Sequence, residues 1–179
     1  MGGLPKPELT VGGRSLIRRV LDAVPAASPR IVVGDVVNRG FITVIEDPPG
    51  SGPAYALRAG LEHVPTVVPF VAVLAADLPF LTPEVMAVLL GAVGDDRDGA
   101  LLADHHGRPQ WLCGVWRRSV LVEHAERAEP GMGMRHLLGG LRYEPVDYLD
   151  SDLPAWFDCD TLDALEYARR LDREFRRDR

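Results

Sequence analysis

Asp77 is the residue of the sequence best placed to do chemistry on a charged substrate. It comes directly after FVAVLAA (residues 70–76), the most hydrophobic stretch of the chain, and just before a proline-containing turn. A carboxylate at the end of a buried strand is suited to hold Mg²⁺, because this hard cation prefers carboxylate oxygens and shares its shell with substrate phosphates. An aspartate is also a common turn former, and this segment alone leaves both interpretations open.

Two further carboxylates, Asp158 and Asp160, stand just ahead of the last helical stretch. Asp160 is suited to cap that helix, since aspartate side chains accept hydrogen bonds from free backbone N–H groups at helix starts. The alternative is that Asp158 or Asp160 completes a metal site opened by Asp77. One side chain can take both roles.

Lys6 belongs to the glycine-rich opening MGGLPKPELTVGG, in which Gly2 and Gly3 precede the lysine. Glycines followed closely by a lysine are typical of phosphate-binding loops, in which the ammonium neutralises phosphate charge. The competing interpretation is an ordinary solvated surface lysine. Such a loop normally follows a buried strand, whereas this sequence opens on the glycines.

A second glycine-rich stretch, EDPPGSGP at residues 46–53, follows a predicted strand and leads into a predicted helix. Asp47 could accept hydrogen bonds from a base or a sugar, and Gly52 could let a nucleotide approach the backbone. Loops this rich in glycine and proline are more often plain turns.

The stretch GRPQW at residues 107–111 is first of all a hairpin turn, although Arg108 and Gln110 could face a bound anion or a planar ring. His105 and His106 precede it. Adjacent histidines have no metal geometry of their own, so we interpret this pair as surface.

The elements that must position these residues follow from the spacing of apolar side chains. The predicted strands are residues 30–34, 42–46, 70–76, 99–103, 110–116 and 141–148. The predicted helices are residues 15–24, 53–64, 83–93, 118–128, 134–141 and 161–177. Thr82 and Pro83 are typical of a helix start.

Strands that alternate with helices predict an α/β fold, a Rossmann-like three-layer sandwich with a mostly parallel sheet. FVAVLAA, which is continuously apolar, is predicted to be a central strand covered on both faces. Ligands of such sheets bind beyond the carboxyl ends of the strands, which is where Asp77 falls.

The bulk composition favours a single cytoplasmic domain over residues 1–179 with a basic C-terminal helix end. The net charge of −6 gives no basic field for nucleic acid or an anionic membrane. No stretch reaches the roughly 20 apolar residues needed to cross a bilayer, and no apolar leader is present. Cys113 and Cys159 lack metal-binding spacing, which favours reduced, buried thiols.

Four motifs occur in order along the chain: MGG-x-x-K, E-D-x-x-x-x-G-P, A-D-L-P-F-L-T-P and D-x-D-T. This ordered set, from residue 1 to about residue 170, resembles the molybdenum cofactor guanylyltransferases and their nucleotidyltransferase relatives. The resemblance implies the nucleotide-diphospho-sugar transferase type of fold. It also implies transfer of GMP from GTP to molybdenum-molybdopterin with release of pyrophosphate, Mg²⁺ as cofactor, and no nucleic acid or membrane partner.

The resemblance also implies roles for single residues. Lys6 matches the phosphate-binding lysine, Asp47 a nucleotide-binding aspartate, and Asp77 the aspartate that holds Mg²⁺ and nucleotide. Asp160 falls where the family has an Asn or Asp near the metal. The expected sites are catalytic Lys6 and Asp77; nucleotide-binding Gly2, Gly3, Lys6, Gly34, Asp47, Gly52 and Asp77; metal-binding Asp77 and Asp160; and acceptor-binding Arg108, Gln110 and Arg135.

The sequence departs from the family pattern at four places. The family signature begins with a strand and a Leu-Ala-Gly-Gly turn ahead of Met-Gly-Gly, where this sequence starts; an upstream start or an impaired loop would account for this. Pro5 replaces an Asp before the lysine, Leu162 replaces a Pro in the last motif, and Gly34 falls where guanylyltransferases often have an Asn. Base choice therefore stays open.

Two alternatives follow. One is a cytidylyltransferase, or a transferase acting on a sugar phosphate or phospholactate, with the same fold and another NTP. The other is a non-catalytic member that binds a nucleotide or a protein. The GSGP stretch slightly favours the guanylyltransferase.

Overall fold

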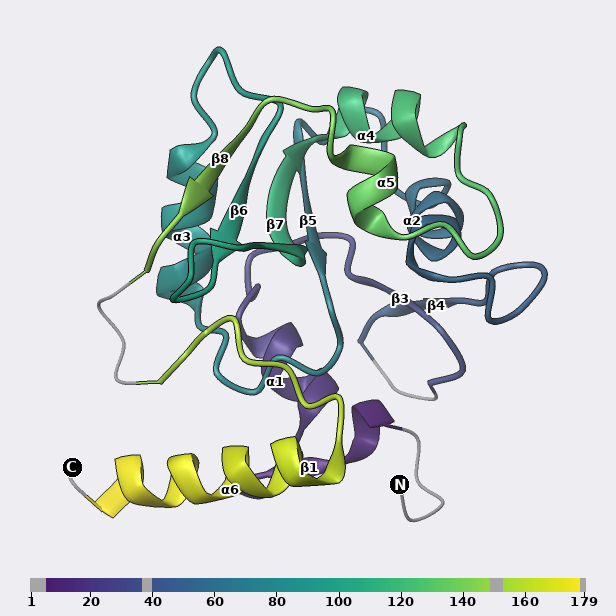
Figure 1. The fold of residues 1–179 in the computed structure, drawn as a ribbon. Helices are drawn as coiled ribbons and strands as arrows, with labels where there is room; N and C mark the ends of the chain where they lie inside the picture. The colour runs from purple at the N-terminus through teal and green to yellow at the C-terminus, as the bar shows by residue number, and fades with distance from the viewer. Residues whose placement is uncertain (1–5, 37–39, 149–152, 178–179) are drawn as a thin grey trace.

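The computed structural model describes residues 6–36, 40–148 and 153–177 (Figure 1). Its elements, in chain order, are η1 (Lys6–Glu8), β1 (Thr10–Val11), β2 (Arg14–Ser15), α1 (Leu16–Asp22), β3 (Ile31–Val33), β4 (Ile42–Val44), α2 (Pro53–Leu61), β5 (Phe70–Leu74), α3 (Pro83–Ala92), β6 (Gly99–Ala103), β7 (Pro109–Arg117), α4 (Arg118–Ala125), α5 (Met134–Leu138), β8 (Tyr143–Val146) and α6 (Leu162–Arg177).

The largest sheet has the strand order β5-β7-β6-β8. β7 is antiparallel to both of its neighbours, and β8 is parallel to β6. Three of these four strands therefore run in one direction, and β7 is reversed because a short turn joins it to β6. The prediction of a mostly parallel sheet is confirmed for strand direction, and the smaller β3–β4 pair is parallel as well.

Helices cover both faces of this sheet, as expected for a Rossmann-like three-layer fold (Figure 1). Ala100 and Leu102 of β6 pack in the core that contains α1 and α3 residues. Leu101, between them, packs with residues of α2, α4 and α5. All three are fully buried, because alternate side chains of one strand point to opposite faces and each face has its own core.

β5 differs from the prediction made for FVAVLAA. Among the described strands it pairs with β7 alone and so ends the four-stranded sheet. Ala72, in its middle, is exposed. The run is continuously apolar, but a strand is buried only where a neighbour covers it, and the outer edge of β5 has no paired strand among the described residues.

An apolar cleft of about 690 Å³ lies along that outer edge. Its lining includes all of β5 and all of β3, together with residues of α1 and α2. We refer to it as the β3–β5 cleft. The cleft lies between the β3–β4 pair and the four-stranded sheet, and β3 and β5 are the edge strands that line it.

The hairpin β1–β2 was not expected from the sequence. Gly12 and Gly13 form its two-residue turn with φ of 58° and 80°, a left-handed pair that glycine adopts without steric cost. The paired glycines between short strand-like segments were the signal that could have predicted it.

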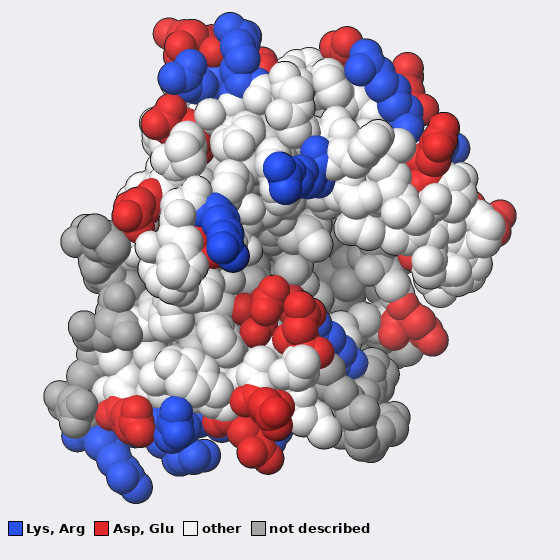
Figure 2. Space-filling view, in the orientation of Figure 1, with Lys and Arg blue, Asp and Glu red and all other residues white. Residues whose placement is uncertain are grey.

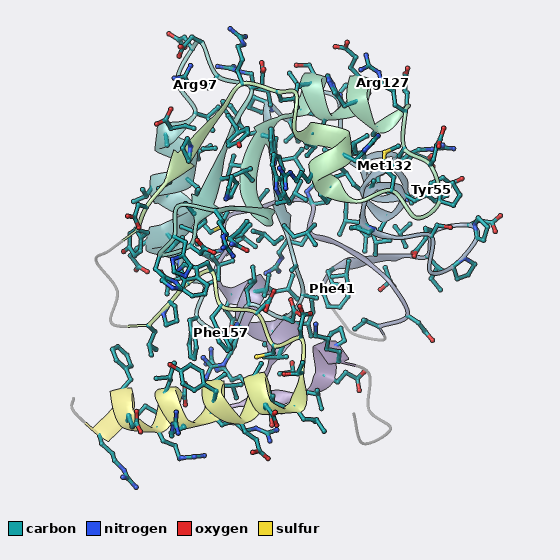
Figure 3. All side chains as sticks on the ribbon, viewed as in Figure 1. Phe41, Tyr55, Arg97, Arg127, Met132 and Phe157 are labelled. Carbon is teal, nitrogen blue, oxygen red and sulfur yellow. The ribbon has the colours of Figure 1, made fainter. Side chains whose placement is uncertain are left out.

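The hairpin packs against α6, the long helix that lies beside β1 in Figure 1. A small core joins the two elements to the loop after β5, through Val11, Phe80, Cys159 and Leu165 among others. Phe157 adds to this contact, with its ring 6.2 Å from Phe80 and 5.5 Å from Tyr167 (Figure 3). The first and last segments of the chain are thereby held beside the turn that follows Asp77.

Two smaller predictions are confirmed. The Thr82 hydroxyl accepts a hydrogen bond from the Val85 N–H and caps α3, with Pro83 at its first position. Cys113 and Cys159 are free, buried thiols, and burial raises their pKa values to about 12 and about 11.

Candidate active site

Lys6 lies between two aspartates from distant parts of the chain. Its ammonium forms an ion pair with the Asp77 carboxylate and donates to Oδ1 of Asp160 at 2.5 Å. We call these three residues the lysine–carboxylate cluster. Figure 2 shows acidic side chains gathered near the centre of this face, above α6, with a basic side chain beside them. The predicted convergence of Lys6, Asp77 and Asp160 is therefore present in the structure.

Asp77 is held by the loop that leaves β5. Asp77 is buried, with 8% of its surface exposed. Its backbone carbonyl accepts a hydrogen bond of 3.2 Å from the Cys159 N–H. This bond joins the Asp77 loop to the segment that carries Asp158 and Asp160, and it brings the two predicted motifs side by side.

Asp160 is not the residue that caps the last helix. The Thr161 hydroxyl accepts a hydrogen bond of 3.1 Å from the Ala164 N–H, and α6 begins at Leu162. Since Thr161 satisfies the helix start, the Asp160 carboxylate turns to Lys6 instead. Its side chain is 69% exposed, which leaves oxygen free for another cation.

The electrostatics of the cluster keep Lys6 charged. Partial burial lowers its pKa, but the hydrogen bonds to Asp160 and Asp77 and the charges of both carboxylates outweigh this, so the pKa is raised above the ordinary 10.5. Desolvation raises the pKa of the neighbouring Asp158, and the charges of Asp160 and Asp77 raise it further. The site thus concentrates negative charge around one cation.

The donor set fits a hard divalent cation. Asp77 and Asp160 come from separate segments and already share one positive charge, and carboxylate oxygen is the ligand that Mg²⁺ prefers. Within the described residues no three His, Cys, Asp or Glu side chains form a metal cage. A cation held here would therefore complete its shell with water and phosphate oxygens, as Mg²⁺ commonly does.

Among the described residues, no hydrogen bond or ion pair joins the predicted nucleotide-binding Gly34, Asp47 and Gly52 to the lysine–carboxylate cluster. Gly34 directly follows β3, has φ of 136°, and donates its N–H to the Val44 carbonyl. Asp47 is exposed in the loop between β4 and α2 and forms no ion pair with another described residue. Gly2 and Gly3 lie outside the described residues. Their nucleotide-binding roles stay predictions.

Gly52 begins α2 with φ of 92° and packs against the backbone of Gly131. The Gly131 N–H also donates to the Ser51 carbonyl at 2.7 Å. These contacts join the predicted nucleotide loop to the loop ahead of α5. Arg135, the second residue of α5, is exposed.

The residues predicted to bind the acceptor are divided between two places. Arg108 lies in the β6–β7 turn, and Gln110 is the second residue of β7. The His105 ring of that turn is 5.2 Å from the ring of Trp156, on the segment that precedes Asp160. Arg135 belongs to α5 and to the Gly52 side. The β6–β7 turn thus contacts the segment that precedes Asp160, whereas Arg135 belongs to a different element, α5.

The sequence holds one further signal for the cluster. Lys6 is the single lysine of the sequence; every other member of the 20 Lys and Arg residues is an arginine. A lysine at this position, where every other residue of the two types is an arginine, indicates a role that requires the compact ammonium group.

The fold and the cluster define a nucleotidyltransferase-like α/β protein. Residues 1–146 match the MobA-like NTP transferase domain. The chain therefore belongs to the MobA-like NTP transferase family. It is 29% identical to the molybdenum cofactor guanylyltransferase of Bradyrhizobium sp. (strain ORS 278), over 96% of this chain and 86% of that protein. It is 31% identical to a probable molybdenum cofactor guanylyltransferase of Natronomonas pharaonis, over 72% of this chain and 67% of that protein.

Solved structures share the fold. Molybdopterin-guanine dinucleotide biosynthesis protein A from Archaeoglobus fulgidus aligns with a TM-score of 0.72 at 20% identity, covering 96% of this chain and 92% of that one. The 2-C-methyl-D-erythritol 4-phosphate cytidylyltransferase from Thermus thermophilus aligns with a TM-score of 0.74 at 19% identity, covering 94% of each. In the described part of the chain, none of the helices has the length and apolar character required to span a bilayer.

Proposed function

We propose that the protein transfers GMP from GTP to molybdenum-molybdopterin in a Mg²⁺-dependent reaction that releases pyrophosphate. Family membership supports the nucleotidyl transfer, and the two guanylyltransferase relatives support the choice of substrates. The observation that carries the proposal is the meeting of Lys6, Asp77 and Asp160 at one point. A triphosphate needs such a concentration of cations and cation ligands to be held and aligned.

The reaction requires no covalent enzyme intermediate. An oxygen of the acceptor phosphate forms a bond to the α-phosphorus of GTP, and the bond from that phosphorus to the bridging oxygen of pyrophosphate breaks on the opposite side. Both reactants are anions, so alignment and neutralisation of charge supply most of the rate.

Lys6 neutralises the departing pyrophosphate in this scheme. Its ammonium moves from the carboxylates to the phosphate oxygens, and its raised pKa keeps it protonated at neutral pH. Asp77 and Asp160 are then free to hold Mg²⁺, which when bound supplies a Lewis acid for the phosphate oxygens. Asp77, the more buried of the two, fixes the position of the site.

The remaining predicted residues divide between the two substrates. Gly34, Asp47 and Gly52 are proposed to contact the base and ribose. Arg108 and Gln110 are proposed to bind the acceptor phosphate, because their turn lies beside the segment that leads to Asp160. Arg135 is proposed to contact the acceptor from the Gly52 side.

The test is pyrophosphate release from purified protein with Mg²⁺ and each of the four NTPs, in separate reactions with molybdenum-molybdopterin, a sugar phosphate or phospholactate as the acceptor. We expect release with GTP and formation of the guanine dinucleotide. Release with CTP alone would assign the cytidylyltransferase instead. Release only with a sugar phosphate or phospholactate would overturn the acceptor, and no release with any NTP and acceptor would support a non-catalytic binder.

A further inference from the structure

Arg19 of α1 forms hydrogen bonds with three separate segments of the chain. Its Nε and Nη2 donate to the Val11 carbonyl at 2.9 and 2.7 Å, and its Nη1 donates to the Pro79 carbonyl at 3.0 Å. Its Nη2 also forms an ion pair with Oδ1 of Asp172 at 2.7 Å. The side chain is only 15% exposed, so these bonds are shielded from water.

Each of these segments carries one member of the lysine–carboxylate cluster. Val11 belongs to the hairpin that follows Lys6, and Pro79 lies two residues after Asp77 in the same turn. Asp172 belongs to α6, which Asp160 precedes. The planar guanidinium, with several donors in fixed directions, can satisfy acceptors in three directions at once.

Asp172, the partner of Arg19, is also buried and fully paired. It is 5% exposed, and its second carboxylate oxygen accepts from Arg176 Nε at 2.8 Å. A buried carboxylate with both oxygens paired avoids the penalty of an uncompensated charge, whereas removal of one partner leaves such a charge behind.

Gly12 in the hairpin turn provides the space for this contact. A Cβ at this position would clash with Oδ2 of Asp172 and with the guanidinium nitrogens of Arg19 and Arg176. The same glycine has φ of 58°, so both the turn and the approach of the ion pair require a residue without a side chain.

We propose that Arg19, paired with Asp172, is a positioning residue that holds the three segments of the lysine–carboxylate cluster in register for nucleotidyl transfer. The part of this inference that concerns catalysis rests on the proposed function. The part that concerns geometry does not rest on that function. It states that the contacts of Lys6 with Asp77 and Asp160 depend on Arg19, which does not touch Lys6.

The first variant is Arg19→Lys. It keeps the positive charge but lacks the planar guanidinium that donates to Val11, Pro79 and Asp172 together. The matched control is Arg18→Lys on the neighbouring position, whose exposed side chain pairs only with Asp22 among the described carboxylates. We expect Arg19→Lys to lower kcat about 10- to 100-fold with little change in the KM for the NTP, since small misplacement of catalytic groups acts on the chemical step. Arg18→Lys should match the wild type.

A second readout is independent of activity. The Cys159 N–H donates to the Asp77 carbonyl at 3.2 Å, so hydrogen exchange at this amide reports how firmly the Asp77 loop is held against the segment that carries Asp160. Exchange at the Cys159 amide should be about 10-fold faster in Arg19→Lys than in the wild type, while exchange at the amides of β6 changes little. Should the wild type prove inactive with every NTP, this exchange measurement alone decides the inference.

Asp172→Asn is the second variant, in case Arg19→Lys does not fold. The amide oxygen still accepts from Arg19 but carries no charge, so we expect the same direction of change in hydrogen exchange at Cys159 and a smaller loss of kcat. If the Cys159 amide of a folded variant of either kind exchanges as slowly as in the wild type, Arg19 is a stabilising residue of the core and the positioning role is wrong.

Discussion

The lysine–carboxylate cluster and the β3–β5 cleft are built in opposite ways. In the cluster, three segments far apart in the sequence meet through charged contacts, and Asp77 is buried there. In the cleft, two apolar strands face each other across open space, and Ala72 in the most hydrophobic stretch of the chain is exposed. Polarity alone would have predicted the reverse burial.

Burial in these two regions follows from the neighbours of a residue rather than from its type. Asp77 is covered because its loop is joined to the Cys159 segment by a backbone hydrogen bond and to Arg19 through the Pro79 carbonyl. β5 is open along one edge because its paired neighbour, β7, lies on the other.

The largest effect is expected at Asp77. Asp77→Ala should lower Mg²⁺-dependent pyrophosphate release about 1,000-fold, since it removes the buried carboxylate on which the proposed cation site depends. The control is Asp95→Ala, at an exposed aspartate in the loop after α3, which should leave turnover unchanged. Near wild-type activity of a folded Asp77→Ala protein would remove this residue from the mechanism.

Lys6→Met should lower turnover about 100-fold, because the leaving phosphate loses a fixed positive charge. The same variant tests the ion pairs. Folding raises the pKa of Lys6 above 10.5, so its pairs stabilise the fold fully below that pH and cease to do so as the pH rises through the folded-state pKa.

Thermal melts of the wild type and Lys6→Met would check this. The difference in Tm should be present at pH 8 and shrink above about pH 10.5. An equal difference at both pH values would mean that Lys6 contributes packing rather than charge.

The cleft is tested by a matched pair of alanines. Ala100→Leu, in the fully buried centre of β6, should reduce the free energy of unfolding by about 1–3 kcal/mol, because a packed core has no room for three more carbons. Ala72→Leu should change it by less than about 0.5 kcal/mol, as at an ordinary exposed site. Equal losses in urea denaturation would show that the cleft is closed in solution.

The smallest effect is expected at Asp158. Desolvation and two neighbouring carboxylates raise its pKa above 3.8, so stability falls as the pH rises from about 4 through the raised value, where the folded state holds a proton that the unfolded state has lost. Asp158→Asn should therefore stabilise the protein at pH 7 by less than about 1 kcal/mol, the gain being limited by solvent screening of this exposed group. A lower Tm at pH 7 would contradict this account.

Local patterns predicted the elements well. Residues 99–103 form β6 as expected, Thr82 caps α3, and the helix predicted at 161–177 is α6 but for its capping residue. These features depend on neighbours in the sequence, where spacing and capping chemistry are visible.

What the sequence could not show were contacts between distant residues. The edge position of β5 depends on which strand pairs with it, and no periodicity encodes that. Likewise the choice of Thr161 over Asp160 as helix cap depends on Lys6, at the other end of the chain. The convergence of Lys6, Asp77 and Asp160 was inferred from resemblance, since their spacing alone left turn and cap interpretations open.

The reactivity of the two buried cysteines, Cys113 and Cys159, measures local and global opening of the protein. Cys159 sits between Asp158 and Asp160 and donates its backbone N–H to the Asp77 carbonyl, while Cys113 lies in the middle of the four-stranded sheet. Both thiols are protonated and shielded at neutral pH, so alkylation proceeds only from opened states. The rate at Cys159 reports how often the joined segments separate, and the rate at Cys113 how often the whole sheet does.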